Sequence, residues 1–226
     1  MTAATGGLDQ SRLQYLRQVI EEDIASGAYK GAAIMVSRHG QVGLDETIGT
    51  YSSTDDRAIR QDSVFSLFSL TKAFTNILML RGVELGRFAF TTRVSDIIPE
   101  FAGPPRNAIE IEHLLTHQTG LPSVFTPVPG LPVDRLDVVV DAICKGLYGM
   151  DAPGRSVSYS PMAAHALMGE ILVRPDPARR SFREIVTQDL LDPRGMTSTS
   201  VGVRADPKAR HIVPEIPDNF PATHPS

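Results

Sequence analysis

Cysteine, long apolar runs and clusters of positive charge are scarce in this 226-residue chain. The single cysteine, Cys144, cannot form an internal disulfide, which fits a reducing compartment. No run of about 18 apolar residues occurs, so a membrane-spanning helix is not expected. The formal net charge is −4, and no block of Lys or Arg forms the positive patch that nucleic acid or an anionic membrane requires. We therefore expect neither nucleic acid nor membrane as a partner.

The N-terminal residues 1–10 also lack the features of a secretory signal, because they are polar and Gly-rich, without a basic start or an apolar stretch. This absence favours a cytoplasmic protein. The chain is 42% hydrophobic and long enough for one large domain, or a domain with a lobe, so it can fill a core. Cys144 lies on an expected helix face and is predicted to be an ordinary core thiol.

The first part of the chain predicts a helix followed by a hairpin. Apolar residues at helical spacing run through residues 8–26, with Asp9 as a cap and Gly27 as the stop. A short apolar run at 31–36, a turn at 38–40 and a second strand from Val42 predict the hairpin. Helical segments joined by Gly- and Pro-bearing loops follow, and we place them at 69–82, 109–117, 161–173 and 181–191.

These patterns predict an α/β chain of the α+β kind in three parts. Residues 1–55 hold the helix and hairpin, residues 56–210 form a helical region, and residues 211–226 are a Pro-rich extended tail. The helix at 69–82 is apolar on nearly all sides, which predicts that it lies in the protein interior.

Ser69 and Lys72 lie at the start of that apolar helix, where a polar and a charged side chain are not expected unless they have a function. Side chains at positions i and i+3 project from one helical face, so the Lys nitrogen can reach the Ser oxygen. An amine that is buried without a partner is expected to act as a base. The positive end of the helix also favours an alkoxide at Ser69. A lone S-x-x-K motif is weak evidence, however, because it occurs by chance.

Four longer motifs, in the same order along the chain, surround this pair. They are Phe65–Lys72 (FSLFSLTK), Leu114–Pro122 (LLTHQTGLP), Pro153–Arg155 followed by Tyr159–Ser160, and Leu191–Met196 (LDPRGM). Together they resemble the superfamily of serine β-lactamases, D,D-peptidases and carboxylic ester hydrolases, of the class C and family VIII type. Arg194 stands where that family usually has Leu.

The resemblance implies a β-lactamase/transpeptidase-like fold, with an antiparallel sheet flanked by helices plus a helical region. It assigns Ser69 as the nucleophile and Tyr159 to the second catalytic motif. Tyr159 and Lys72 would then share the proton taken from Ser69, because a phenol beside a cation becomes a usable base. His113 and His117 are interpreted as structural hydrogen-bonding residues, since this variant needs no His.

The substrate-binding residues are also predicted by the resemblance. The loop Ser123, Val124 and Phe125 is expected to line the pocket, together with Ser160 and Pro161. The family usually has Asn where Pro161 stands, and proline can neither donate nor accept as that amide does. This departure favours the esterase branch.

A second departure concerns the family's third motif, K-T-G or its equivalents, which has no match after Met196. The opening hairpin at 31–50 would then lack its neighbouring strands, and an exposed edge promotes association. We hypothesise that the chain is truncated, a fragment, or one chain of a split enzyme. Association with a second copy or with a complementing C-terminal chain is expected.

Three functions remain open at this stage. The leading hypothesis is a carboxylesterase that forms an acyl-enzyme on small acyl esters. The second is a β-lactamase, or a D-amino-acid peptidase or amidase, that uses the same residues on an amide. The third is a catalytically incomplete half-domain that binds a partner. No cofactor is predicted, and no metal either, because Asp and Glu pairs at ligand spacing are absent.

Overall fold

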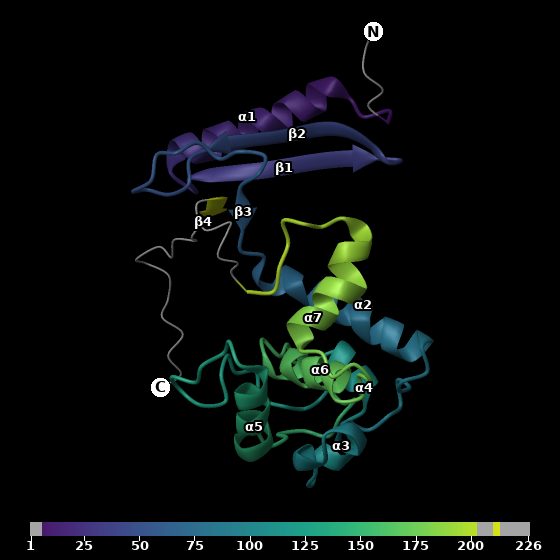
Figure 1. The fold of residues 1–226 in the computed structure, drawn as a ribbon. Helices are drawn as coiled ribbons and strands as arrows, with labels where there is room; N and C mark the ends of the chain where they lie inside the picture. The colour runs from purple at the N-terminus through teal and green to yellow at the C-terminus, as the bar shows by residue number, and fades with distance from the viewer. Residues whose placement is uncertain (1–5, 203–209, 213–226) are drawn as a thin grey trace. The chain divides into compact units, whose positions relative to one another are not determined.

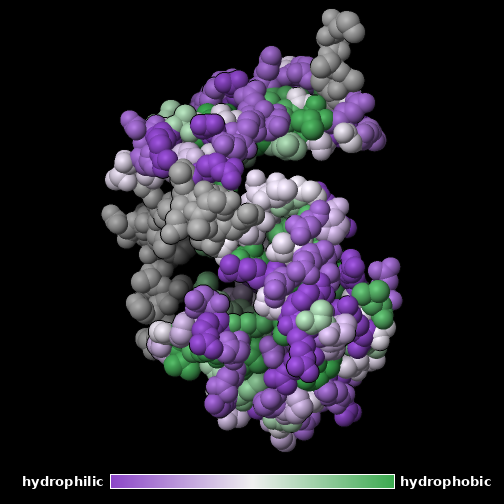
Figure 2. Space-filling model, viewed as in Figure 1, coloured by the Kyte–Doolittle hydropathy of each residue, from purple (hydrophilic) through white to green (hydrophobic). Residues whose placement is uncertain are grey.

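The structure is a computed structural model, and it describes residues 6–202 and 210–212. These residues divide into two compact units (Figure 1). The first unit contains residues 6–66 together with 210–212, and the second contains residues 67–202. On the face seen in Figure 2, hydrophilic residues cover most of the outer surface and apolar residues show in smaller patches.

Helix α1 of the first unit spans Gln10–Ser26 and confirms the expected caps. Asp9 accepts two backbone N–H groups of the first turn through its side chain, and Gly27 ends the helix in the left-handed conformation, with φ 84°. Leu13 and Ile20 are its buried residues, and they lie about two turns apart on one side of the helix. This side gives α1 an apolar face that packs on the hairpin (Figure 1).

The hairpin consists of β1, Gly31–Arg38, and β2, Gln41–Gly49, paired antiparallel as predicted. His39 and Gly40 form its turn, and both have positive φ, 52° and 74°. Such a turn matches the right-handed twist of the flanking strands. Among the described residues this sheet has two strands.

A second, short sheet pairs β3, Val64–Phe65, in parallel with β4, His211–Ile212. The contact is reinforced by a hydrogen bond of 3.2 Å between Ser66 Oγ and His211 Nε2. The remainder of the predicted Pro-rich tail, residues 213–226, lies outside the described residues.

The second unit is helical within the described residues. Its elements in chain order are a 3₁₀ turn at Phe68–Leu70, α2 at Thr71–Glu84, α3 at Val94–Ile97, 3₁₀ turns at Pro99–Phe101 and Arg106–Ala108, α4 at Ile111–Leu115, α5 at Leu136–Gly146, α6 at Ala163–Val173, α7 at Phe182–Val186, a π-helical turn at Thr187–Leu191 and a 3₁₀ turn at Asp192–Arg194.

Helix α6 is the centre of this unit. It packs against α2, α3, α4, α5 and α7, and most of its residues are buried, which is typical of a helix that is apolar on all sides. Small residues such as Ala163, Ala164 and Gly169 let its neighbours approach closely. Cys144 on α5 is 8% exposed and packs in the same core, so the prediction of a core thiol is confirmed.

The prediction that the helix of Ser69 is buried on nearly all sides is wrong. Only one face of α2 is buried, and it consists of Thr75, Leu78, Met79 and Gly82. Leu70, Ile77 and Leu80 are 70%, 44% and 50% exposed. The described fold packs α6, α7 and the π-helical turn against a single side of α2, and apolar composition alone does not say which side a neighbour covers.

A buried charge network joins the segment after α6 to the π-helical turn. The Asp176 side chain is fully buried and receives three hydrogen bonds of 2.8–3.2 Å from the backbone and guanidinium of Arg180. Arg180 also contacts both carboxylate oxygens of Asp189, at 2.8 and 3.1 Å. These hydrogen bonds from Arg180 lower the pKa of Asp176 from 3.8 to about 2. A charge buried this way is stable only while its partners remain.

Asp176→Asn is therefore expected to destabilise the fold by about 3 kcal/mol at pH 7, because it leaves Arg180 with one carboxylate fewer. The folded pKa lies below the unfolded one, so this stabilisation is present above about pH 4 and is lost as the pH falls toward 2. Urea unfolding of the variant and the wild type at pH 7 and pH 3 measures both effects.

The matched control is Asp137→Asn, which removes the carboxylate of an exposed ion pair with Arg135, and the two side chains are 68% and 63% exposed. An exposed pair contributes about 0–1 kcal/mol, so this variant should unfold nearly as the wild type does. Equal stability losses in the two variants would contradict a special role for the buried network.

Candidate active site

Ser69 lies in the 3₁₀ turn that leads directly into α2. The preceding residue, Phe68, has a φ of 46°, a conformation that is rare for a bulky side chain. Strained backbone of this kind often occurs at functional sites, where the surrounding structure holds it in place. Ser69 is exposed, and the positive end of the α2 dipole lies next to it.

Lys72 and Tyr159 both reach the hydroxyl of Ser69. Lys72 Nζ donates to Ser69 Oγ over 3.3 Å, and Ser69 Oγ and the Tyr159 hydroxyl are 2.8 Å apart. The Lys72 ammonium also lies 5.2 Å from the centre of the Tyr159 ring. The structure thus brings the three predicted catalytic residues together, although Tyr159 is 90 positions from Ser69 in the chain.

Contacts on both sides hold Tyr159 in this place. The His117 carbonyl accepts the N–H of Ser158 over 2.9 Å, and His117 Nδ1 accepts the N–H of Ser160 over 3.2 Å. The His117 ring packs on the Tyr159 ring with centroids 5.0 Å apart. Ser123 Oγ donates to the Tyr159 carbonyl over 2.6 Å. The prediction that His117 has a hydrogen-bonding role is confirmed by these contacts.

His113 is likewise a hydrogen-bond acceptor, because its Nδ1 accepts the N–H of Glu110 over 3.0 Å and so caps the N-terminus of α4.

The loop that follows α4 requires glycine at position 120. This residue has a φ of 69°, and a Cβ there would collide with the carbonyl oxygen of Asp151. Only glycine allows the loop after α4 to lie this close to the segment that leads to Tyr159.

The electrostatics of the site favour proton transfer through Tyr159. Its hydrogen bond with Ser69, and next its interaction with Lys72, lower the pKa of the Tyr159 phenol below its ordinary value. Burial, and to a lesser degree the charge of Lys72, lower the pKa of His117. His117 is therefore a neutral packing partner at physiological pH, and the basic groups next to Ser69 are a phenol and an amine.

His165 was not predicted as a site residue, and it lies on α6, shortly after Tyr159 in the chain. Its ring is tilted against that of His117 with centroids 6.0 Å apart, and its buried Nδ1 has no hydrogen-bond partner among the described residues. Burial, followed by the charge of Lys72, lowers the pKa of His165 to about 3, so the ring stays neutral. In the sequence His165 stands among apolar residues of a helix, so it could not be distinguished from an ordinary core residue.

Comparison with known proteins identifies the family. The model of the Beta-lactamase family matches residues 16–221, which is most of the chain. The chain belongs to the β-lactamase family. A solved penicillin-binding protein homologue from Caulobacter crescentus is 26% identical and superposes with a TM-score of 0.77 over 92% of this chain and 55% of that one. The expected β-lactamase/transpeptidase-like fold is thereby confirmed, with a small, incomplete sheet in this chain.

Two curated proteins are similar to this chain in sequence. Protein flp of Staphylococcus aureus strain NCTC 8325 / PS 47 is 30% identical over 193 residues, which are 83% of this chain. Esterase EstB of Burkholderia gladioli is 30% identical over 154 residues, which are 66% of this chain. The match covers 38% of the length of each of these relatives. The chain therefore spans well under half of the curated relatives it matches.

The structure places the five residues predicted to bind substrate in different settings. Ser123 contacts the Tyr159 backbone, Val124 packs against the core, and Phe125 is 71% exposed. Ser160 is buried and its Oγ accepts the N–H of Ala164 over 3.1 Å, at the start of α6. Pro161 lines a cavity beside Lys72. Substrate contact by these five residues stays a prediction.

Within the part of the chain that the structure describes, no group of three or more His, Cys, Asp or Glu side chains gathers in a way that could hold a metal ion. In the same residues, no helix combines the length and apolar character needed to cross a bilayer.

Proposed function

We propose that this chain carries the nucleophile of a serine hydrolase and that its substrates are carboxylic esters. The observation that supports this most directly is the convergence of Lys72 Nζ and the Tyr159 hydroxyl on Ser69 Oγ, at 3.3 and 2.8 Å. A nucleophile with a base inside hydrogen-bond distance is the arrangement that covalent catalysis requires.

The reaction follows from these contacts. Ser69 Oγ attacks the ester carbonyl carbon, and its proton passes to the Tyr159–Lys72 pair. The tetrahedral intermediate collapses, the bond to the alcohol oxygen breaks, and the same pair returns the proton to the departing alcohol. Water then attacks the acyl-enzyme by the reverse route and releases the carboxylic acid. The lowered pKa of Tyr159 fits this role, because it brings the phenolate form closer to working pH.

An ester is favoured over an amide by Pro161. This residue lies beside the site, has no backbone N–H, and offers no side-chain donor or acceptor for the acyl-side amide of a β-lactam or peptide. The likeness to esterase EstB supports the same choice. Hydrolysis of β-lactams or D-amino-acid amides, and a purely partner-binding half-domain, are the alternatives that an experiment must separate.

Two measurements test the proposal. Turnover of p-nitrophenyl acetate and butyrate should exceed turnover of nitrocefin, and a fluorophosphonate should label folded protein stoichiometrically at the peptide that contains Ser69. Faster turnover of nitrocefin would favour the amide alternative. Folded protein that takes up no label and turns over neither substrate would refute a hydrolase in this chain.

A further inference from the structure

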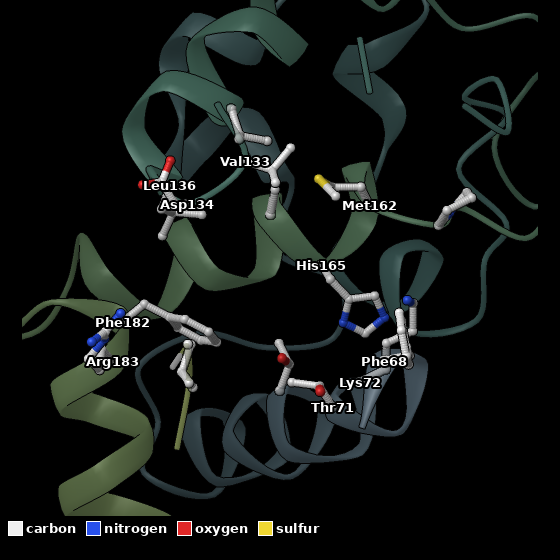
Figure 3. Close-up of a pocket in the computed structure, with 16 residues that line it drawn as sticks. Phe68, Thr71, Lys72, Val133, Asp134, Leu136, Met162, His165, Phe182 and Arg183 are labelled. Atoms are coloured by element: carbon white, nitrogen blue, oxygen red, sulfur yellow. The ribbon is translucent and has the colours of Figure 1, made fainter. Parts of the chain in front are cut away.

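A cavity of about 380 Å³, partly open to solvent, lies in the helical unit and is lined by residues of α2, α5, α6 and α7 (Figure 3). This volume falls within the range of roughly 300–1,000 Å³ that is typical of small-molecule sites. The position of the cavity and the chemistry of its lining indicate which part of a substrate it can hold.

The cavity begins at the nucleophile. Phe68 and Lys72 line one end, and they lie one residue before and three residues after Ser69 in the chain. Lys72 Nζ is the atom that donates to Ser69 Oγ, so the same side chain borders both the reaction centre and the cavity. Figure 3 shows Phe68 and Lys72 at one end, with Asp134 and Arg183 toward the other.

The walls between these ends are mostly apolar. Leu136 and Val139 of α5, Met162 before α6, Ala166 of α6 and Phe182 of α7 form them. Figure 3 shows the Phe182 ring and the Met162 side chain turned toward the space between the helices.

The titratable groups of the lining are Lys72, Asp134, Arg183 and His165, and Lys72 Nζ already donates to Ser69 Oγ at the near end. His165 borders the cavity as a neutral ring, with its pKa lowered to about 3 by burial and by Lys72. Asp134 and Arg183 at the far end carry opposite charges, so they do not select a charged group of either sign.

We propose that this cavity binds the acyl chain of the substrate, and that the chain is a neutral aliphatic one of medium length. This inference rests on the proposed ester hydrolysis at Ser69. If each carbon occupies about 30 Å³, as a water molecule does in the liquid, a chain of about eight carbons fills roughly two thirds of the cavity of about 380 Å³, and about twelve carbons would fill it. An acetyl group would leave most of the cavity empty, whereas each further CH₂ of a longer chain buries more apolar surface and strengthens binding.

The position of Tyr159 indicates that the acyl part of the ester lies in the cavity and that its alcohol part faces solvent. The phenol that returns the proton to the departing alcohol must face that oxygen. Tyr159 is 47% exposed and does not line the cavity, whereas Lys72 does. The alcohol therefore lies on the Tyr159 side, and the cavity on the Lys72 side is left for the acyl chain.

The test compares kcat/KM for p-nitrophenyl octanoate and acetate in the wild type and in Leu136→Trp. Leu136 is partly buried on α5 and lines the cavity, so a larger side chain there fills it. The octanoate-to-acetate ratio is expected to be above one in the wild type and to fall by about tenfold or more in the variant, since the loss of apolar contact for even one methylene costs about tenfold. Leu136→Ala enlarges the cavity and should move the preference toward longer chains.

Val138→Trp is the matched control, because Val138 lies on the same helix but does not line the cavity, and its ratio should equal that of the wild type. Circular dichroism verifies folding, and Leu136→Ala carries the test if the Trp variant does not fold. A ratio that is the same in the wild type and both Leu136 variants overturns the acyl-chain assignment while leaving ester hydrolysis intact. Absence of turnover and of Ser69 labelling with every ester refutes the proposed function instead.

Discussion

Ser69→Ala is expected to lower ester turnover by at least ~10³-fold and to abolish covalent labelling by a fluorophosphonate. The reason is that no other side chain can form the acyl-enzyme from the position of Ser69 Oγ, on which Lys72 and Tyr159 converge. Steady-state kinetics with p-nitrophenyl butyrate, and intact-mass measurement after labelling, give the two readouts.

Ser66→Ala serves as the control for this variant, because Ser66 is exposed on the same segment but its hydroxyl contacts His211. Its turnover and its labelling should match those of the wild type. A full mass shift on the Ser69→Ala protein would mean that the reactive hydroxyl belongs to another residue, and the proposed mechanism would then fail.

Tyr159→Phe is expected to reduce kcat/KM by about 10²–10⁴-fold, the usual contribution of a positioned general base and acid. The variant keeps the ring that packs on His117 and loses only the hydroxyl 2.8 Å from Ser69 Oγ. The effect should fall on the chemical step, so labelling by the fluorophosphonate should slow as well.

The pH profile distinguishes this role from a structural one. The phenol acts as a base in its deprotonated form, so kcat/KM of the wild type should rise with pH through an apparent pKa below the ordinary value of tyrosine. That apparent pKa belongs to the Tyr159–Lys72 pair and not to one residue. Tyr159→Phe should lose this rising limb.

Tyr148→Phe is the matched control, because Tyr148 is 63% exposed and its hydroxyl donates to the carbonyl of Lys145, away from the site. Its rate and its pH profile should equal those of the wild type. A Tyr159→Phe protein with an unchanged rate and an unchanged profile would assign the proton transfer to Lys72 alone.

The elements that were predicted well are those set by local interactions. Helix α1 begins after Asp9 and ends at Gly27, because a side-chain cap and a left-handed glycine act within one turn of the backbone. The hairpin follows from the turn at His39–Gly40, whose positive φ values set the pairing of its strands. Each signal lies within a few residues of the structure it determines.

The predictions that failed or were missing depend on distant contacts. Leu70, Ile77 and Leu80 look like core residues in sequence, but the side of α2 that is covered depends on where α6 and α7 pack. His165 was not singled out, since only the packed helices bring it near Lys72 and His117. Periodicity reports how apolar a helix is, and does not report its neighbours.

By itself, the sequence determined that Ser69 and Lys72 share one helical face and that α1 begins after Asp9 and ends before Gly27. It also determined that the motifs are those of the β-lactamase family. The resemblance predicted that Tyr159 acts on Ser69, but only the tertiary structure decided the geometry of that contact and that an apolar cavity begins at Lys72. The physical reason is range. An i, i+3 contact needs one turn of backbone, whereas the phenol is placed by backbone hydrogen bonds that His117 accepts from Ser158 and Ser160 and that Ser123 donates to Tyr159, between residues about 40 positions apart in the chain.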